Sequence, residues 1–458
     1  MAKTKNYEIN MTDGNLFIKI FKFSIPLIIT GVLQLLYTAV DMIVVGKFAG
    51  AAALSAVGST TALVNMIINI FMGLSVGVGV CISRYYGAKD YDSMEKTIHT
   101  AIALAIIGGI FLACISRFIL EPILVAMSTP TEVLTNALLY LQILFLGMPF
   151  NLIYNFGAAM LRATGDTQRP LKFLASAGVV NVIFNLIFVI VFDMGVAGVA
   201  IATIISQFLS SSMVMISMMK GKGILKFEIK KLKIHKTQFK KIVRIGLPAG
   251  IQASLFSISN VMVQSSINSF NSTIITAGNA ASTSLEGFMY VATNSVTQAA
   301  MTASGQNMGA GEYSRVKKGA GISVLMSIIV STVLGVFFII FSENLVALYS
   351  DGDIEVIAVG VQRLKYMATF YVACALMDVM VGQLKGMGYY IFPTIVSFCG
   401  VCVFRIFWVS VVFAIYPTLD TIFLVYPISW SITAFMQLII LVVAMKKLPK
   451  SKSQLMKV

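Results

Sequence analysis

The chain has 458 residues, of which 58% are hydrophobic and 12% are charged, and its formal net charge is +15. Soluble domains carry about 25% charged residues, so the composition excludes an ordinary soluble domain. The basic surplus would suit a nucleic-acid-binding protein, but 29 of the 34 Lys and Arg fall near the two ends and in alternate gaps between apolar segments. This is the positive-inside pattern of a membrane protein, and we expect no nucleic-acid partner.

Twelve apolar segments follow one another along the chain, and each is long enough to cross a bilayer as a helix. Open strands cannot satisfy their backbone polar groups in lipid, so all twelve are expected to be helical. The first segment shows no cleavable leader and is itself an expected span. The expected spans are 20–46, 52–82, 95–117, 132–160, 170–192, 196–219, 242–269, 274–303, 316–341, 356–384, 391–416 and 420–445. The predicted fold class is an all-α membrane protein with 12 transmembrane helices.

The first span contains a single charge, Asp41, in the apolar run from Phe23 to Val45. A carboxylate that faces lipid at mid-depth costs about 2.5–3.5 kcal/mol. Gln34 lies seven residues earlier, two helical turns away on the same face. We therefore expect this face to line a polar cavity. The alternative is that Asp41 lies near the outer headgroups, where an ionised carboxylate costs little free energy.

The fifth and sixth segments carry neutral polar residues at a depth similar to that of Asp41. Asn181 and Asn185 are four residues apart and share one face of a helix. Amide and hydroxyl oxygens around one carboxylate suit a hard monovalent cation, or a proton on that carboxylate. The alternative is that the asparagines only form hydrogen bonds between helices, each of which stabilises the fold by about 0.6 kcal/mol. The candidate cation or proton site is Asp41, Asn181, Asn185, Thr203, Tyr140 and Asn155. If the ion is a metal, Na⁺ is the candidate, at Asp41, Asn181, Asn185 and Thr203.

The longest polar gap, residues 220–241, is strongly basic and separates two groups of six segments. Its alternating lysines and apolar residues predict a cytoplasmic linker that lies on the membrane surface, in part as an amphipathic helix. The predicted organisation is an N-lobe at 1–219, this linker at 220–241, a C-lobe at 242–445 and a cytoplasmic tail at 446–458.

The two halves repeat one another. Pro26 in FSIPLI matches Pro248 in IGLPAG at an offset of 222, and YYGAKDY matches NMGAGEY at the same offset. LRATGDTQRP at 161–170 aligns with LKGMGYYIFP at 384–393 at an offset of 223. Several matches at nearly one offset indicate an internal repeat. Because each half has an even number of spans, the two lobes are expected to share one orientation and to be pseudo-symmetric.

The second half carries its own acids within apolar segments, Glu286 and Asp378. Asp378 occupies the repeat position of Asn155. Together with Gln34, these two acids are the predicted substrate site or second coupling site. Arg405 is an isolated arginine in the eleventh segment, and it is expected to pair with Asp378 or to extend toward the interface.

The chain resembles the multidrug and toxic compound extrusion (MATE) family. The resemblance rests on SIPLIITGVLQLLYTAVDMIVVGKFAG, the paired GAKDY and QNMGAGEY loops, LRATGDTQRP with its repeat, and the six-plus-six layout, and it covers roughly residues 15–445. It implies two six-helix lobes in a V and an antiporter that exports cationic, amphipathic drugs in exchange for Na⁺ or H⁺. It also implies that the N-lobe cation site maps onto Asp41, Asn181, Asn185 and Thr203, with Gln34, Tyr140 and Asn155 nearby. The family's acid on segment seven is replaced here by Phe256, which leaves Asp378 without that partner unless Glu286 substitutes.

The expected function is secondary active efflux rather than enzymatic catalysis, because no P-loop, nucleophile elbow or zinc signature is present. We expect a monomer in the cell membrane with both termini cytoplasmic, in contact with membrane lipids and small cationic or amphipathic substrates, and with Na⁺ or H⁺ as the coupling ion in place of a cofactor. The alternatives are a lipid-linked saccharide flippase, an intramembrane enzyme and a major facilitator. A flippase needs a more cationic cleft, an enzyme needs clustered catalytic groups, and a major facilitator carries a basic loop pattern that RYYGAKDYDSMEK lacks.

Overall fold

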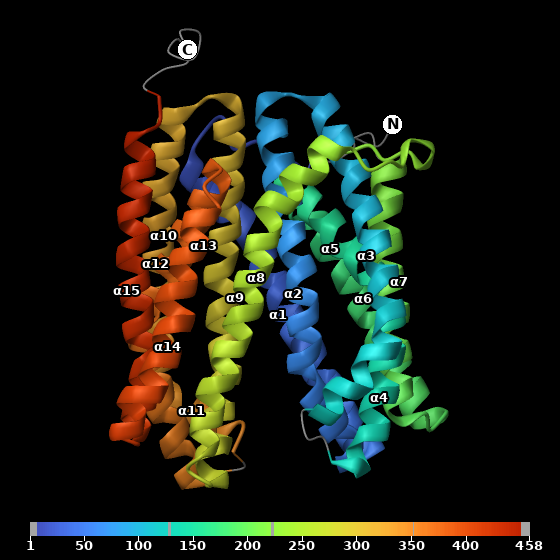
Figure 1. Ribbon diagram of the computed structural model, residues 1–458, viewed down its shortest axis with the longest axis vertical. Coiled ribbons are helices and arrows are strands. Elements are labelled where there is room, and N and C mark those ends of the chain that lie inside the picture. Colours follow the sequence, from blue (N-terminus) through green and yellow to red (C-terminus); the bar gives the residue numbers. More distant parts are fainter. Residues whose placement is uncertain (1–6, 127–129, 221–223, 351, 450–458) are drawn as a thin grey trace. The chain divides into compact units, whose positions relative to one another are not determined.

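A computed structural model describes residues 7–126, 130–220, 224–350 and 352–449. These residues form helices and short connections, with no strand among them, so the predicted all-α fold class is confirmed (Figure 1). Residues 450–458, most of the expected cytoplasmic tail, lie outside the described ranges. The first-half helices are α1 (Leu16–Val44), α2 (Ala51–Ala88), α3 (Tyr91–Ala126), α4 (Thr131–Leu146), α5 (Met148–Ala163), α6 (Gln168–Leu186) and α7 (Gly195–Lys220).

The second half follows the same plan with more interruptions. Its helices are α8 (Lys236–Asn268), α9 (Thr273–Ala310), α10 (Tyr313–Ile340), the short α11 (Ser342–Ala347), α12 (Ile354–Met387), α13 (Ile391–Ser397), the single turn α14 (Phe404–Phe407) and α15 (Leu419–Lys446). π-helical segments flank several of them: η1 (Val45–Ala49), η2 (Ile187–Val191), η4 (Phe398–Val403) and η5 (Trp408–Phe413).

Ten helices in the described ranges are long and apolar enough to cross a membrane, or eleven when the bent pair α4 and α5 counts as one span. That pair bends by 51° next to Gly147, and Pro149 occupies the first turn of α5. The expected span at 274–303 lies on α9, which has 38 residues but is rich in Ser, Thr and Asn and falls short of the hydropathy of a span. All twelve expected segments are therefore helical, and eleven of them also have the length and hydropathy of a span.

The internal repeat is visible in the ends of the helices. α2 and α9 both have 38 residues, and both ends are offset by 222. Each helix stops at a residue with positive φ, Lys89 at +57° and Gly311 at +72°. Gly165 and Gly388, at +96° and +93°, follow the matched helices α5 and α12 and are offset by 223. Equivalent turns thus end equivalent helices, which confirms the pseudo-symmetric halves predicted from sequence.

The chain divides into two compact units. The described residues of unit 1 are 7–9, 32–126, 130–220 and 224–250, and those of unit 2 are 10–31, 251–350 and 352–449. The division differs from the borders expected from sequence, because the first half of α1 belongs to unit 2 and the first half of α8 belongs to unit 1. Both helices contain an internal proline, Pro26 in α1 and Pro248 in α8, shortly before the residue at which the unit changes.

Glycines let α2 approach the first half of α8 closely within unit 1. Gly73 and Gly77 on α2 face Gly246 and Gly250 on α8, and each pair forms a G-x-x-x-G spacing. A methyl group on Gly73 would lie 2.1 Å from the backbone nitrogen of Gly250. Small residues at this spacing allow backbone-to-backbone contact between membrane helices.

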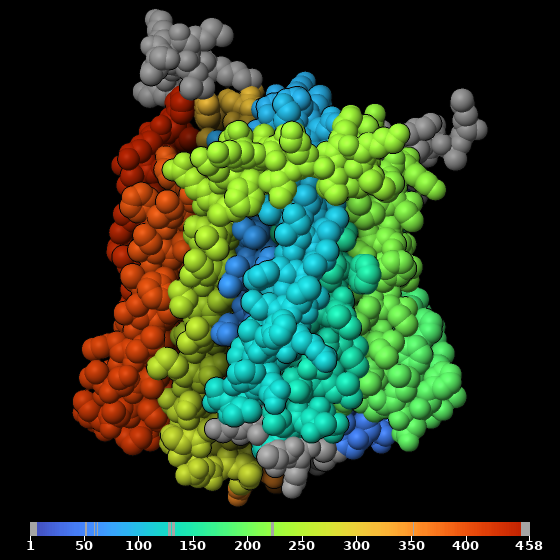
Figure 2. Space-filling model, turned by 45° about the vertical axis from the view of Figure 1, so that its right-hand side comes forward, coloured from blue at the N-terminus to red at the C-terminus, as the bar shows by residue number. Residues whose placement is uncertain are grey.

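The basic linker packs on unit 1 at the start of α3, and Figure 2 shows it as an exposed yellow-green band together with the start of α8. The buried ring of His99 lies between the carbonyl oxygens of Glu95 (2.8 Å from Nδ1) and Glu228 (3.1 Å from Nε2), and it stacks on Phe227. The backbone N–H of His235 donates to Thr100 Oγ1 at 3.0 Å. Within the described linker, residues 224–235 contain one 3₁₀ turn, Ile229–Lys231, and residues 236–241 form the first turns of α8.

Candidate functional site

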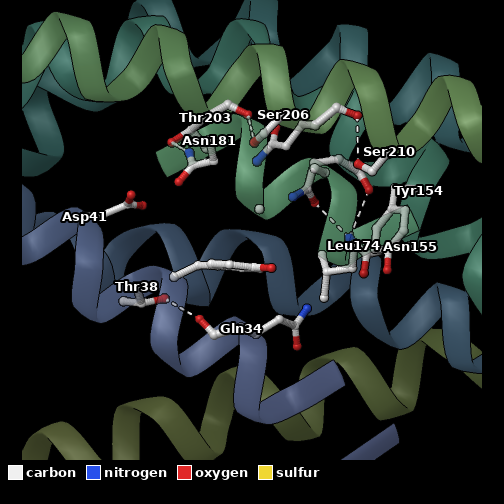
Figure 3. A pocket seen from close by; sticks show the side chains of 15 residues that line it. Gln34, Thr38, Asp41, Tyr154, Asn155, Leu174, Asn181, Thr203, Ser206 and Ser210 are labelled. Carbon is white, nitrogen blue, oxygen red and sulfur yellow. Dashed lines mark hydrogen bonds between the residues drawn. The ribbon is translucent and has the colours of Figure 1, made fainter. Parts of the chain in front are cut away.

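A polar cavity of about 200 Å³ lies within unit 1, between α1, α5, α6 and α7. Figure 3 shows Asp41 at one end near Asn181 and Thr203, and Asn155 and Tyr154 at the other. Of the residues that line it, Asp41 is the only carboxylate, and none is Lys or Arg. The lining residues are Gln34, Tyr37, Thr38, Asp41, Asn151, Tyr154, Asn155, Leu174, Ala177, Gly178, Asn181, Thr203, Ser206, Gln207 and Ser210.

Asp41 lies in the last turns of α1 and receives a hydrogen bond from α6. The Nδ2 of Asn185 donates to Asp41 Oδ1. The same Nδ2 donates to Asn181 Oδ1 at 3.2 Å, one turn earlier on α6. Asn185 is fully buried, and its Oδ1 has no hydrogen-bond partner among the described residues. The amide of Asn185 therefore joins the one ionisable acid of the cavity to its neutral neighbours.

The hydrogen-bonded chain continues from α6 onto α7. Asn181 Nδ2 lies 3.5 Å from Thr203 Oγ1, and Thr203 in turn donates to the carbonyl oxygen of Val199 at 2.9 Å. Asp41, Asn185, Asn181 and Thr203 thus form one connected group across three helices. Sequence counting predicted that Asn185, Thr203 and Asp41 would lie at similar depth, with Asn181 one turn earlier on the face of Asn185, and the structure brings the four side chains together.

The close approach of α1 to α6 depends on Gly178. A Cβ atom there would lie 1.8 Å from the ring of Tyr37, and the hydroxyl of Tyr37 donates to the carbonyl oxygen of Ala175 at 3.3 Å. The missing side chain thus lets Tyr37 lie flat against α6 and brings α1 within hydrogen-bonding reach of Asn185. Sequence analysis did not identify this position.

Two predicted members of the cation group make no hydrogen bond to Asp41, Asn181, Asn185 or Thr203 among the described residues. Tyr140 packs against the apolar cluster of Val44, Val45, Val57, Val189, Val196 and Val199, and it does not line the cavity. Asn155 lines the opposite end, where its Nδ2 donates to the backbone and side-chain oxygens of Asn151 at 2.9 and 3.1 Å. The bend between α4 and α5 redirects the helix that carries Asn155. Neither residue is hydrogen-bonded to the Asp41 group.

Gln34 lines the same cavity as Asp41, so the predicted polar face of the first span is found. Thr38 also lines the cavity, and its hydroxyl donates a hydrogen bond within α1, to the carbonyl oxygen of Gln34 at 3.1 Å. Sequence reasoning missed Gln207, which also lines the cavity and whose buried Oε1 has no hydrogen-bond partner within the described chain. Its polarity inside an apolar segment was a signal that could have been used.

Comparison with known proteins identifies the family. A family model described as MatE matches residues 26–187 and 248–411, which is more than half of the chain. The chain belongs to the MATE family. The two matched blocks coincide with the two halves of the repeat, and the multi-pass helical membrane fold agrees with that membership.

Individual MATE relatives match over most of their length. The chain is 28% identical over 379 residues to the probable multidrug resistance protein YpnP of Bacillus subtilis, covering 83% of this chain and 84% of that protein. It is 23% identical over 397 residues to the probable multidrug resistance protein NorM of Thermotoga maritima, covering 85% and 84%. A solved outward-facing multidrug resistance MATE family transporter of the MOP superfamily superposes with a TM-score of 0.90 at 19% identity, covering 98% and 100%. At that identity the likeness shows the fold alone.

Unit 2 of this MATE protein places its acids differently from what sequence predicted. Glu286 on α9 accepts a hydrogen bond from Arg363 Nη2 on α12 at 2.8 Å, which makes an ion pair in which the arginine is 3% exposed. Glu286 is therefore already paired with a cation. Sequence reasoning missed Arg363, although a buried acid needs such a partner and this arginine lies within an apolar segment.

Asp378 on α12 has no hydrogen bond or ion pair among the residues that the structure describes. Lys385, two turns further along the same helix, acts on it electrostatically. Arg405 is not its partner, contrary to the expected pairing. Arg405 instead contacts Asn260 and Ser429, which lie on α8 and α15. The expected pairing failed because sequence counting gives depth but not the direction in which a side chain projects.

Proposed function

We propose that this protein is a secondary active efflux transporter that exports small cationic and amphipathic compounds in exchange for Na⁺ or H⁺. Membership of the MATE family and the names of its relatives, two probable multidrug resistance proteins, support export of more than one compound. The ten or eleven apolar helices support a multi-pass location in the cell membrane. The protein acts as a monomer in contact with membrane lipids.

The observation that carries the proposal is the hydrogen bond from Asn185 to Asp41 in a cavity that is otherwise neutral. A carboxylate inside an apolar span is costly unless it has a function or a partner. Asn185 is a neutral partner, so it stabilises the charge without cancelling it. No side chain that lines the cavity carries a positive charge, so neutralisation of the Asp41 carboxylate requires an arriving cation or proton.

The donor set around Asp41 fits such a cation. Every available ligand atom is an oxygen, and the buried Oδ1 of Asn185 has no partner within the described chain. Hard cations are bound by carboxylate, carbonyl and hydroxyl oxygens. The residues that would hold Na⁺ are Asp41, Asn181, Asn185 and Thr203, while H⁺ would reside on Asp41 alone. When bound, either ion supplies one positive charge against the carboxylate.

The charge of Asp41 controls how firmly α1 is joined to α6. When the carboxylate is ionised, Asn185 Nδ2 donates a charge-assisted hydrogen bond, which is about twice as strong as a neutral one. When the carboxylate is neutral, this preference is lost and the amide is free to turn. The contact between α1 and α6 therefore depends on the ion, and this dependence couples ion binding to the position of α1.

The direction of transport depends on how the protein is oriented in the membrane. The excess of Lys and Arg in alternate gaps supports cytoplasmic N- and C-termini. The basic linker, with Lys226, Lys230, Lys231 and Lys233, then faces the cytoplasm beside anionic lipid headgroups. Asp378 is a candidate for a second coupling or substrate site in unit 2, whereas Glu286 is engaged by Arg363.

Export of a lipid-linked saccharide is less well supported. Such a substrate carries phosphates, which require cationic ligands, and the unit 1 cavity offers a carboxylate and neutral amides instead. The names of the relatives refer to multidrug resistance and not to saccharides. No observation on the cavity favours this alternative.

The test is substrate uptake by purified protein in liposomes. A fluorescent monocation such as ethidium is offered under an imposed Na⁺ gradient, then under an imposed pH gradient, and finally with neither. Under at least one gradient, we expect ethidium to accumulate above the level seen without a gradient. The ionophore for the same ion should abolish this accumulation. Equal ethidium uptake in all three conditions would show that no coupled antiport occurs.

A further inference from the structure

The linker between the two halves is folded onto unit 1. Leu225 and Phe227 are buried, at 5% and 3% exposed. The backbone N–H of Phe227 donates to the carbonyl oxygen of Met218, near the end of α7, at 3.2 Å, and its ring stacks on that of His99 in α3. The described linker is therefore a fixed part of the surface of unit 1, where Figure 2 shows it exposed together with the start of α8.

The contacts with α3 show at which depth the linker lies. It meets α3 at His99 and at Thr100, whose Oγ1 accepts a hydrogen bond from the backbone N–H of His235 at 3.0 Å. Lys96 is the last charged residue before residues 97–116, which contain no Lys, Arg, Asp or Glu. His99 and Thr100 lie about 4.5–6 Å beyond Lys96 along the helix axis. The linker thus packs where α3 changes from polar to apolar, which in a membrane helix is the boundary between headgroups and acyl chains.

Four apolar side chains of the linker remain exposed close to these contacts. They are Ile229 (63% exposed), Leu232 (39%), Ile234 (40%) and Phe239 (36%). Ile229 and Ile234 are direct sequence neighbours of the two linker residues that contact α3. When a segment lies in the plane of the membrane interface, its apolar side chains enter the headgroup–acyl boundary by about 5–10 Å. The exposed apolar side chains are therefore better placed for contact with lipid than with water.

Five lysines of the same segment are exposed and form no ion pair or hydrogen bond with any residue that the structure describes. They are Lys226, Lys230, Lys233, Lys236 and Lys240. Lys231, in contrast, is paired with Glu95 and Glu228, each at 3.0 Å. Glu228 is the single acid among residues 224–241, and it is already engaged by Lys231. The segment therefore carries a surplus of positive charge that no ion pair within the described chain neutralises.

We propose that this surface binds anionic phospholipids of the inner leaflet. The linker face consists of Ile229, Leu232, Ile234 and Phe239 together with Lys226, Lys230, Lys233, Lys236 and Lys240. Basic residues beside a membrane attract anionic headgroups, and long lysine side chains reach those headgroups from the depth of the acyl boundary. The apolar side chains insert between the lipids and hold the linker face at that depth. This lipid binding is a property beyond the proposed antiport and does not depend on it.

A tryptophan introduced in place of Ile229 reports on lipid at the linker face. The chain has two tryptophans, Trp408 and Trp430, so the reporter is Ile229→Trp in a Trp408→Phe/Trp430→Phe background. The purified protein is placed in vesicles of phosphatidylcholine and phosphatidylglycerol in which one of the two lipids carries brominated acyl chains, which quench tryptophan on contact. We expect brominated phosphatidylglycerol to bind beside the reporter at least about fivefold more tightly than brominated phosphatidylcholine, and this preference should shrink as salt is raised.

Removal of lysines tests the charged part of the linker face. Lys233→Gln/Lys236→Gln should reduce the preference for phosphatidylglycerol to less than about twofold. The matched control, Lys317→Gln/Lys318→Gln, removes two exposed lysines from the start of α10 and should leave the preference unchanged. If the reporter background does not fold, as judged by its melting profile, native mass spectrometry of bound phosphatidylglycerol compares the same two lysine pairs with both native tryptophans in place.

A second quencher tests whether the apolar side chains insert into the membrane. The tryptophan in place of Ile229 should be quenched strongly by brominated acyl chains and weakly by acrylamide in the water. The matched control is Tyr91→Trp in the same background, at the first residue of α3, where the native side chain is 49% exposed. This position lies about 12 Å before His99 along the helix axis, so its tryptophan should be quenched more by acrylamide than by brominated chains.

Equal binding of the two lipids beside the reporter would overturn the proposal. Equal loss of preference in the two lysine pairs would do so too, because net charge rather than the linker face would then select the lipid. Displacement of phosphatidylglycerol by an equal concentration of inorganic phosphate would show that the lysines bind a free anion instead. A reporter quenched by acrylamide and not by brominated chains would place the linker face in water. If, in addition, light scattering detects dimers that Leu232→Gln abolishes, the linker face contacts a second copy of the chain and not lipid.

Discussion

Asn185 is the residue on which the geometry of the candidate site depends most. Its Nδ2 donates to Asp41 and to Asn181, and its Oδ1 is buried without a partner within the described chain. Asn155 lines the cavity that Asp41 also lines, but its described hydrogen bonds go to Asn151 and to no ionised group. Asn185 and Asn155 therefore offer a matched comparison of two asparagines in unit 1, of which only Asn185 contacts Asp41.

Asn185→Ala should shift the coupling-ion concentration at half-maximal uptake by about 10- to 100-fold, because hydrogen bonds to charged groups contribute about 1.5–3 kcal/mol. Loss of the Nδ2 donor favours protonation of Asp41, so the shift is toward lower H⁺ concentration for a proton, whereas loss of the Oδ1 ligand shifts it toward higher Na⁺ concentration for sodium. The measurement is the dependence of ethidium uptake in liposomes on the concentration of the coupling ion. Asn155→Ala should change that dependence by less than about threefold. Equal effects of the two substitutions would show that the Asp41 hydrogen bond has no special role.

At the scale of elements, α2 and the first half of α8 are held together by glycines and not by large side chains. A Cβ atom on Gly73 would meet the backbone of Gly250, and one on Gly77 would lie 2.5 Å from the carbonyl oxygen of Ile242. Backbone atoms cannot move aside as a flexible side chain does. Gly321 on α10 lies in open space, with nothing within 4 Å of an added methyl group.

Gly73→Ala should destabilise the purified protein by about 1–3 kcal/mol, the usual cost of overpacking. Gly321→Ala should be neutral or stabilising by up to about 1 kcal/mol, since alanine favours a helix over glycine. Melting in detergent, followed by circular dichroism, measures both. A Gly73→Ala protein that melts with or above wild type would contradict the close contact of α2 and α8.

The elements could be predicted from sequence because lipid forces apolar segments of this length to be helical. The repeat offset also predicted the matching ends of α2 and α9. The connected group of Asp41, Asn185 and Asn181 followed from depth and helical spacing. What could not be predicted were the features that depend on rotation about the helix axis, such as the packing of Tyr140 in an apolar cluster. The sequence also did not predict that the first half of α1 belongs to unit 2 and the first half of α8 to unit 1. Hydropathy does not indicate which neighbours a helix packs against.

At the scale of the whole molecule, the proposed mechanism requires a fixed orientation in the membrane. The basic residues of the ends and of the linker support a cytoplasmic location for both termini. The connection between α6 and α7, near Asp193, and that between α8 and α9, near Asn271, should lie on the opposite side. Each follows a helix that starts from a basic, cytoplasmic gap.

Reporter fusions test this orientation. A fluorescent protein fused after Val458 should be bright, and alkaline phosphatase fused there should be inactive. Fusions truncated after Asp193 or Asn271 should show the reverse, with active phosphatase and no fluorescence. A bright fluorescent fusion after Asp193 would contradict the assignment, because that position would then share a side with the termini.

The central claim is that the carboxylate of Asp41 couples ion movement to export. The most direct measurement compares wild type, Asp41→Asn and the control Asp92→Asn, which removes an exposed acid of α3 that is paired with Lys96. Purified proteins in liposomes are assayed for ethidium accumulation under the effective ion gradient. We predict that Asp41→Asn folds and binds ethidium but accumulates no more of it than in the absence of a gradient. Asp92→Asn should accumulate ethidium as wild type does. Gradient-driven accumulation by Asp41→Asn at the wild-type rate would contradict the account.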